Sequence, residues 1–146
     1  MQDFKIFNRR VGSKHKPLII VELGINHNGK FSIAKQIIDK AKMAGAEIIK
    51  HQTHLAEFEM SEEAKKIIPV HTKDNIFKII SDCSLSEGDE IKLKQYIQKK
   101  KMIFISTPFS REASNRLNKM KVPAFKIGSG ECNNYPLIEH ICKFNK

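Results

Sequence analysis

At 146 residues the chain has room for one modest globular domain, and its 40% hydrophobic and 29% charged residues are typical of a cytosolic protein. No run approaches the roughly 18 consecutive apolar residues that a membrane-spanning helix requires. Residues 1–10 alternate apolar and polar side chains and lack the apolar segment of a secretory signal. We therefore expect a cytoplasmic location and no membrane partner.

The net charge of +10 raises the question of nucleic-acid binding. Lysine supplies nearly all of this excess and is spread along the chain, and no aromatic-and-basic stacking pattern occurs. The only arginines are Arg9, Arg10, Arg111 and Arg116. The composition therefore favours a lysine-rich solvated surface and no nucleic-acid partner.

The three cysteines, Cys83, Cys132 and Cys142, have no C-x-x-C spacing and cannot all pair within one chain. This pattern favours a reducing compartment over a disulfide framework. We expect the thiols to act as small apolar groups in or near the core.

Hydrophobic periodicity and turn residues predict alternating strands and helices. In chain order we expect a short hairpin from 4–7 returning near Lys16, a buried strand at 18–21, a helix at 31–43, a strand beginning at 47–50, helical turns near 61–67 and 75–81, a helix at 86–101 with Ser86 as its N-cap, a strand at 102–106, a helix at 110–120, a strand at 124–127 and a helix at 136–144.

Four strand-then-helix units in series predict an α/β fold with a parallel sheet. Doubly wound sheets and barrels both satisfy this order. Polar residues follow all four strands, which favours a barrel, because all strand ends of a barrel converge on one mouth. A complete (β/α)₈ barrel takes about 250 residues, so we expect residues 1–146 to form its N-terminal half, about four β/α units of a TIM barrel, with exposed strand edges.

Three clusters carry candidate chemistry. The first, 22–29, puts a carboxylate at a strand end beside glycines and asparagines, although an ordinary turn has the same composition. The second, 50–54, closes a strand with a lysine and contains two histidines whose spacing is weak for a metal and fits structural or substrate-contacting residues. The third, 125–136, joins a lysine, a Gly-Ser-Gly turn and a glutamate.

Two lysines at neighbouring strand ends and a Gly-Ser turn together predict a phosphorylated substrate. No Walker A or G-x-G-x-x-G pattern is present, which argues against a nucleotide.

The strings Glu-Leu-Gly-Ile-Asn-His-Asn-Gly from Glu22, Lys-His-Gln-Thr-His from Lys50, Ser-Thr-Pro-Phe-Ser-Arg from Ser106 and Phe-Lys-Ile-Gly-Ser-Gly-Glu-Cys-Asn-Asn-Tyr-Pro from Phe125 closely resemble bacterial N-acetylneuraminate (sialic acid) synthases. The resemblance extends over nearly the whole chain, in order and at family spacing. Legionaminic and pseudaminic acid synthases are close relatives, so the reaction is better defined than the sugar.

The resemblance implies a TIM barrel followed by an antifreeze-like domain, a homodimer, and a divalent metal, usually Mn²⁺. It also implies condensation of phosphoenolpyruvate with N-acetylmannosamine or a related N-acetylated hexose, giving a nonulosonic acid and phosphate. Lys50, Lys126 and Ser129 match the positions that hold phosphoenolpyruvate, and Gln52 matches a residue near the sugar. Glu131 matches an acid that orients water or moves a proton, and Glu22 matches the acid at the end of the first strand.

Two departures from the family pattern matter. Pro69-Val70-His71 stands where the family often has Pro-Gly-Asn, and His71 is explained equally well by altered sugar choice and by drift. In the family, the two metal-binding histidines, the second half of the barrel and the antifreeze-like domain lie beyond the position of Lys146. We therefore expect no metal ligands among these 146 residues and no activity from them alone.

Two other interpretations stay open. One is a non-catalytic half-barrel that binds phosphate-bearing ligands or complements a separate chain carrying the other half. The other is a decayed remnant without a stable fold. A different phosphoenolpyruvate-dependent aldol synthase is disfavoured by the sugar-side string from Lys50.

Overall fold

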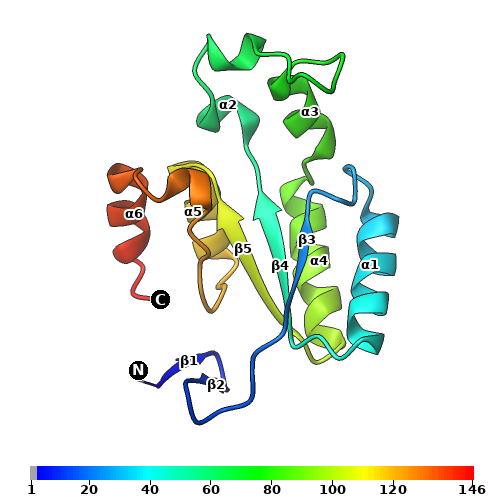
Figure 1. The fold of residues 1–146 in the computed structure, drawn as a ribbon, viewed down its shortest axis with the longest axis vertical. Helices are drawn as coiled ribbons and strands as arrows, with labels where there is room; N and C mark the ends of the chain where they lie inside the picture. The colour runs from blue at the N-terminus through cyan, green and yellow to red at the C-terminus, as the bar shows by residue number, and fades with distance from the viewer. Residues whose placement is uncertain (1–2) are drawn as a thin grey trace.

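The computed structural model describes residues 3–146. Its centre is a parallel sheet in the order β3-β4-β5, formed by Ile20–Gly24, Ile48–Thr53 and Ile103–Pro108 (Figure 1). A separate antiparallel hairpin pairs β1 (Phe4–Ile6) with β2 (Arg9–Val11) near the amino ends of these strands. The fold is therefore mixed α/β, as predicted, with each sheet strand followed by helical structure.

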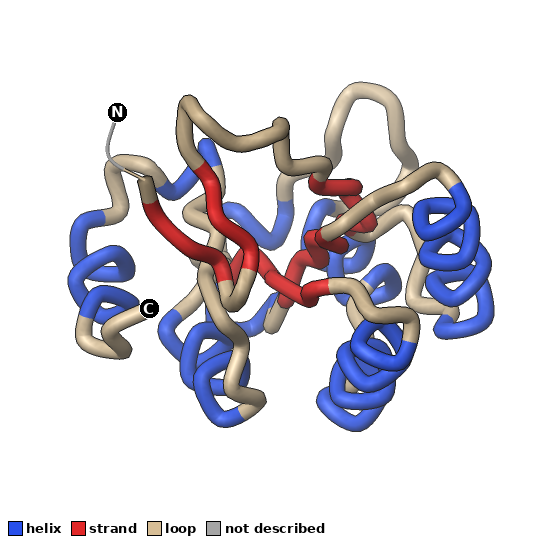
Figure 2. Tube along the Cα trace, turned by 90° about the horizontal axis from the view of Figure 1, so that it is seen from below, coloured by secondary structure: helices blue, strands red, loops and turns tan. Residues whose placement is uncertain are grey.

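Three helices cover one face of the sheet and bury the main core between them and the strands. They are α1 (Phe31–Met43), α4 (Glu87–Lys99) and α5 (Arg111–Lys119), and Figure 2 shows the helices ranged outside the strands. Each helix places small or branched apolar residues toward the sheet at helical spacing. The core comprises Leu23, Ala34, Ile38, Ala41, Ala46, Ile49, Leu85, Leu93, Ile97, Met102, Phe104, Leu117, Met120 and Val122.

Several helix boundaries follow from local hydrogen bonds that the sequence predicts. The hydroxyl of Ser86 accepts a hydrogen bond from the Asp89 amide at 3.1 Å, which makes Ser86 the N-cap of α4 as expected. Ser110 caps α5 in the same way through the Ala113 amide. Helix α1 begins and ends at the predicted residues.

The long connection after β4 forms a helical projection beyond the carboxyl ends of the strands (Figure 1). It contains α2 (Ala56–Glu59), the 3₁₀ turn η1 (Ala64–Lys66) and α3 (Ile76–Cys83). The two predicted helical turns correspond to η1 and α3, whereas α2 was not predicted. Within the described residues no helix is long and apolar enough to cross a membrane.

The fourth predicted unit is only partly formed. Residues 124–127 make one isolated parallel bridge, between Phe125 and Ser106, in place of a strand, and they lead into η2 (Ser129–Glu131) and α6 (Tyr135–Cys142). A strand requires consecutive residues that pair with a neighbouring strand. Residues 124–127 lie at the margin of the sheet and pair through Phe125 alone, so they do not form one. The sheet of residues 3–146 therefore has three strands.

Four further expectations need correction. Lys50 does not close its strand but is the third residue of β4, which continues to Thr53 because the ladder with β5 pairs all six residues. The first sheet strand is not buried at its start, where Ile20 is 42% exposed. The reason is that β3 is an edge strand with a neighbour on one side only. The hairpin returns through Arg9–Val11 and not near Lys16. Cys132 and Cys142 are exposed, because they lie in a turn and at a helix end outside the core, and only Cys83 is half-buried.

At the amino ends of the strands, the hairpin is tied to the sheet by an ion pair of 2.6 Å between Arg9 and Glu47. A cavity of about 860 Å³ lies beside it, lined among others by Lys42, Lys101 and Lys121. These lysines stand at the carboxyl ends of α1, α4 and α5, where positive charge offsets the negative end of each helix dipole.

Candidate functional site

At the carboxyl end of the sheet, the strand register brings Glu22 of β3 beside Lys50 of β4, and their side chains form an ion pair. Gly24 adopts a positive φ of 52°, which turns the chain away from the sheet directly after Glu22. A methyl group on Gly24 would stand 3.3 Å from Glu22 Oε1 and 3.7 Å from Gln52 Oε1. The structure therefore brings Glu22, Lys50 and Gln52 together as one group.

Alternation along β4 separates these polar residues from the core. Lys50 and Gln52 point to the face that the three core-forming helices leave uncovered, and His51 and Thr53 point to the helix-covered face and are buried. Gln52 pairs in register with Thr107 of β5. The uncovered face of the sheet thus carries the candidate ligand-contacting groups at its carboxyl end.

The third predicted cluster lies next to β5. The Lys126 amide donates to the Ser106 carbonyl at 3.0 Å, which fixes the chain as it leaves the Phe125 bridge. Ser129 and Glu131 form η2, and a methyl group on Gly128 would stand 3.4 Å from the Thr107 methyl. Thr107 is thus adjacent both to Gln52 and to the turn that carries Ser129 and Glu131.

The six predicted residues consequently form two neighbouring groups. Lys126 and Ser129 are exposed, and the Glu131 carboxylate accepts a hydrogen bond of 2.6 Å from the side-chain Nδ2 of Asn134. The Lys126 ammonium donates to the Ile127 carbonyl. Between residues 3 and 146, no hydrogen bond or ion pair joins the Glu22–Lys50–Gln52 group to the Lys126–Ser129–Glu131 group.

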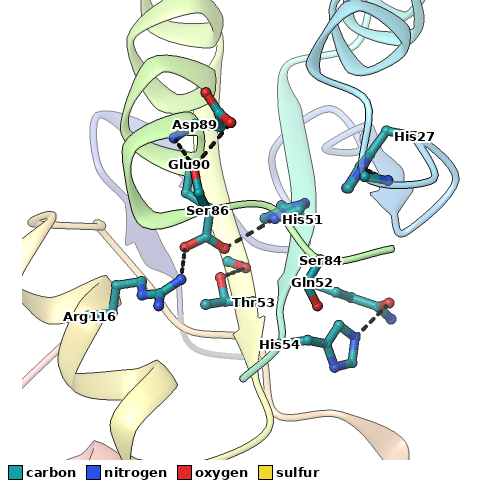
Figure 3. Close-up of polar contacts among 12 residues, drawn as sticks. His27, His51, Gln52, Thr53, His54, Ser84, Ser86, Asp89, Glu90 and Arg116 are labelled. Atoms are coloured by element: carbon teal, nitrogen blue, oxygen red, sulfur yellow. Dashed lines mark hydrogen bonds and ion pairs between the residues drawn. The ribbon is translucent and has the colours of Figure 1, made fainter. Parts of the chain in front are cut away.

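A buried polar network lies on the opposite, helix-covered face of the same strands (Figure 3). Glu90 of α4 is 1% exposed, and its carboxylate accepts from Arg116 of α5 at 3.1 Å. His51 Nε2 lies 3.2 Å from the other oxygen of Glu90, at ion-pair distance without hydrogen-bond geometry. This network joins β4 to two helices beneath the site, which makes His51 a structural residue in this fold.

His27 packs against His51 with the rings tilted by 37° and their centroids 5.2 Å apart, and it links the turn after β3 to the network. Its Nδ1 accepts from the Gly29 amide at 3.1 Å, whereas its buried Nε2 has no partner among the described residues. Burial, aided by the neighbouring His51 and opposed by Glu90, lowers the pKa of His27 to about 4. The imidazole is therefore neutral near pH 7.

A third histidine, His54, directly follows β4 and lies beside Gln52. The His54 ring stacks on Phe109 at a centroid distance of 4.2 Å, and its Nδ1 lies 2.9 Å from Glu59 Oε1. Its Nε2 lies 3.4 Å from Gln52 Oε1 (Figure 3). His54 thus connects the Glu22–Lys50–Gln52 group to α2.

Sequence reasoning missed Glu59, Glu90, Phe109 and Arg116. One of them left a signal: Glu90 stands three residues before Leu93 and seven before Ile97, on the stripe of α4 that faces the core. A glutamate on an apolar stripe indicates a buried partner. The others depend on contacts between distant segments or on a helix that was not predicted.

The described residues do not provide a metal site by themselves. Between Asp3 and Lys146, no group of three or more histidine, cysteine, aspartate or glutamate side chains is placed to hold a metal ion. His71, the departure from the family pattern, lies exposed in the turn between η1 and α3. Its effect on sugar choice stays a prediction.

Residues 37–146 match the model of the NeuB family. The N,N'-diacetyllegionaminic acid synthase of Campylobacter jejuni is 35% identical over 90% of this chain and 40% of its own length. The N-acetylneuraminate-9-phosphate synthase of Mus musculus is 33% identical over 92% of this chain and 38% of its own length. The chain thus spans about 40% of the length of the curated relatives it matches.

A solved structure agrees with these matches. The N-acetylneuraminic acid (sialic acid) synthetase of Leptospira borgpetersenii, crystallised in complex with citrate, superimposes with a TM-score of 0.82 at 28% identity. The similarity covers 98% of this chain and 47% of that one. The three-stranded parallel sheet with its helices therefore matches part of a TIM-barrel-type synthase fold.

Proposed function

Because the chain belongs to the NeuB family, we propose that it forms the part of a nonulosonic acid synthase that binds phosphoenolpyruvate and orients an N-acetylated hexose, such as N-acetylmannosamine. In the proposed reaction, C3 of phosphoenolpyruvate forms a bond to the aldehyde carbon of the open-chain sugar. Water then adds at C2, and cleavage of the C2–O bond releases inorganic phosphate. The activities named for the relatives, legionaminic acid and N-acetylneuraminate-9-phosphate synthesis, support the reaction class.

The observation that carries this proposal is the convergence of Glu22, Lys50 and Gln52 at the carboxyl end of the strands. This end is where barrel enzymes keep their catalytic groups. A lysine whose side chain is only 16% exposed keeps an ammonium where water is limited, which strengthens its attraction for a phosphate or carboxylate. An ordinary structural turn would not require a charged pair there.

Each residue then has a defined role. Lys50, Lys126 and the Ser129 hydroxyl bind the phosphate and carboxylate of phosphoenolpyruvate through charge-assisted hydrogen bonds. Gln52 contacts the sugar through its carboxamide. Glu131, held by Asn134, orients the attacking water and accepts its proton. Glu22 holds the Lys50 ammonium until an anionic substrate arrives.

The metal of the family does not enter this part of the mechanism. The family resemblance implies Mn²⁺, but residues 3–146 do not bring together three or more histidine, cysteine, aspartate or glutamate side chains that could coordinate it. We therefore derive no step through a metal, and we assign to this chain substrate binding, water orientation and proton transfer.

We further propose that residues 1–146 form the N-terminal half of a (β/α)₈ barrel, with Phe125 marking the fourth strand. The exposed Ile19 and Ile20, at the free edge of β3, support this, because strand edges in a closed barrel are paired. The same edge favours the alternative function, a half-barrel that complements a separate chain. The homodimer that the family resemblance implies would be formed by the whole barrel.

Phosphate release from phosphoenolpyruvate, N-acetylmannosamine and Mn²⁺ tests the proposal. We expect none from the 146-residue chain alone, and release when the remaining part of the Campylobacter jejuni relative is added. Lys126→Met in the mixture should suppress the release, whereas Lys14→Met in the hairpin region should not. Calorimetry that detects no binding of millimolar phosphoenolpyruvate, together with a silent mixture, would show that the proposal is wrong.

A further inference from the structure

Asn134 is the N-cap of α6, and this cap decides which way its carboxamide points. The Leu137 amide donates to Asn134 Oδ1 at 3.2 Å, the usual bond between a capping side chain and the first turn of a helix. A backbone N–H can only donate, so the atom that it contacts must be the carbonyl oxygen of the side chain. The backbone of α6 therefore fixes Nδ2 as the opposite end of the carboxamide.

That donor end holds the carboxylate of Glu131. Nδ2 of Asn134 donates to Glu131 Oε2 at 2.6 Å, and the Asn134 backbone amide donates to the Glu131 carbonyl at 3.1 Å. The Glu131 amide in turn donates to the Gly128 carbonyl at 3.0 Å. Asn134 thus fixes both the backbone and the side chain of Glu131. Within residues 3–146, Oε2 has this donor and Oε1 has no hydrogen-bond partner.

The Glu131 side chain starts beside the candidate site. A methyl group on Gly128 would stand 3.7 Å from Glu131 Cγ and 3.4 Å from the Thr107 methyl, so both side chains flank the same turn. Thr107 pairs in register with Gln52 of the neighbouring strand. Of the two carboxylate oxygens next to the site, Oε1 is therefore the one available to a reacting group.

We propose that Asn134 is a positioning residue for the proton transfer assigned to Glu131, and that it makes Oε1 the oxygen that accepts the proton. As the water oxygen forms its bond to C2, one of its O–H bonds breaks and the proton passes to Oε1, while Oε2 keeps accepting from Nδ2. This inference rests on the proposed function, because it specifies how Glu131 acts in that reaction. Asn134 is assigned no contact with the substrate and acts through Glu131.

Substitution separates the cap from the positioning contact. Serine caps a helix about as well as asparagine, so Asn134→Ser keeps an oxygen for the Leu137 amide and removes the NH₂ donor to Glu131. Asn75→Ser is the matched control. Asn75 caps α3 in the same way, through the Lys78 amide at 2.8 Å, and its NH₂ group has no partner between residues 3 and 146. We expect the two variants to have similar midpoints in urea denaturation, so that a difference in function is not a difference in folding.

Hydrogen exchange measures the contact in the chain without any substrate. In ¹H–¹⁵N spectra of the labelled chain, we expect the NH₂ hydrogens of Asn134 to exchange about tenfold more slowly than those of Asn75, the protection expected from one hydrogen bond to a charged group. Glu131→Ala should remove this difference and leave Asn75 unchanged. Equal exchange at Asn134 and Asn75 in the unaltered chain would overturn the proposal.

Phosphate release by the mixture with the remaining part of the Campylobacter jejuni relative supplies the second readout. Asn134→Ser should lower kcat about tenfold and leave KM for phosphoenolpyruvate within about twofold, because only the proton acceptor is displaced. Asn75→Ser should change neither value. An active mixture in which Asn134→Ser leaves kcat unchanged would overturn the positioning role and leave the proposed function standing. A mixture that is silent with the unaltered chain would overturn both.

Discussion

Glu22 and Lys50 face each other across the β3–β4 ladder, and the lysine of this ion pair is the less exposed partner, at 16% against 49% for the glutamate side chain. An anionic ligand that binds Lys50 must therefore compete with a carboxylate that can swing into water. The pair keeps the ammonium oriented in the absence of substrate, and it makes binding of an anion depend on the release of Glu22.

Removing the competitor should tighten anion binding. Glu22→Gln is expected to lower the Kd for phosphoenolpyruvate by up to about fivefold, since partly exposed ion pairs contribute about 0.2–1 kcal/mol. Lys50→Met should raise the same Kd about tenfold or more, because a charge-assisted hydrogen bond is lost. Isothermal titration calorimetry measures both values. Weaker binding by Glu22→Gln would mean that Glu22 supports the bound ligand and does not compete with it.

The buried ion pair between Glu90 and Arg116, beneath the candidate site, should contribute strongly to the free energy of unfolding. Glu90→Gln leaves Arg116 without its countercharge, and we expect a loss of about 3 kcal/mol in the free energy of unfolding. Urea denaturation followed by circular dichroism checks this. Glu87→Gln, on an exposed position of the same helix, should change stability by less than about 0.5 kcal/mol. Similar losses in the two variants would contradict the buried network.

Stability should fall on acidification because of His27. Burial lowers its folded-state pKa to about 4 from an ordinary value of 6.5, so the unfolded chain binds more protons between these values. The contribution of His27 is therefore complete above pH 6.5 and is lost as the pH falls toward 4, by up to about 3 kcal/mol. His27→Gln should flatten the stability–pH curve over this range, and His71→Gln, at an exposed position, should not.

The turn that carries the first cluster should not tolerate a side chain at Gly29. This residue has a φ of 68°, and a methyl group there would stand 2.3 Å from the Asp82 carbonyl oxygen. Gly45→Ala is the control that measures the cost of a positive φ without a steric clash, because Gly45 has a φ of 86° and open space around it. We expect losses of about 1 kcal/mol for Gly45→Ala and at least about 2 kcal/mol for Gly29→Ala in thermal or urea unfolding. Equal losses would mean that the turn yields to the methyl group.

Local patterns in the sequence determined the helices and the location of the candidate groups. The bounds of α1, the Ser86 cap and the presence of Lys50 and Gln52 on a strand all follow from interactions within a few residues, so a single segment contains the information. The end of that strand does not, since β4 continues to Thr53. The resemblance likewise rests on short strings, and the family match confirms it.

Only the tertiary structure decided which of these groups meet. Glu90 and Arg116 are 26 residues apart, and Glu22 reaches Lys50 only through the register of two strands. The contact of His54 with Gln52 and Glu59 depends on α2, a helix of four residues that is too short for a periodic signal. The predicted strand at 124–127 is reduced to one bridge, because strand formation requires a neighbouring strand and propensity alone does not supply one.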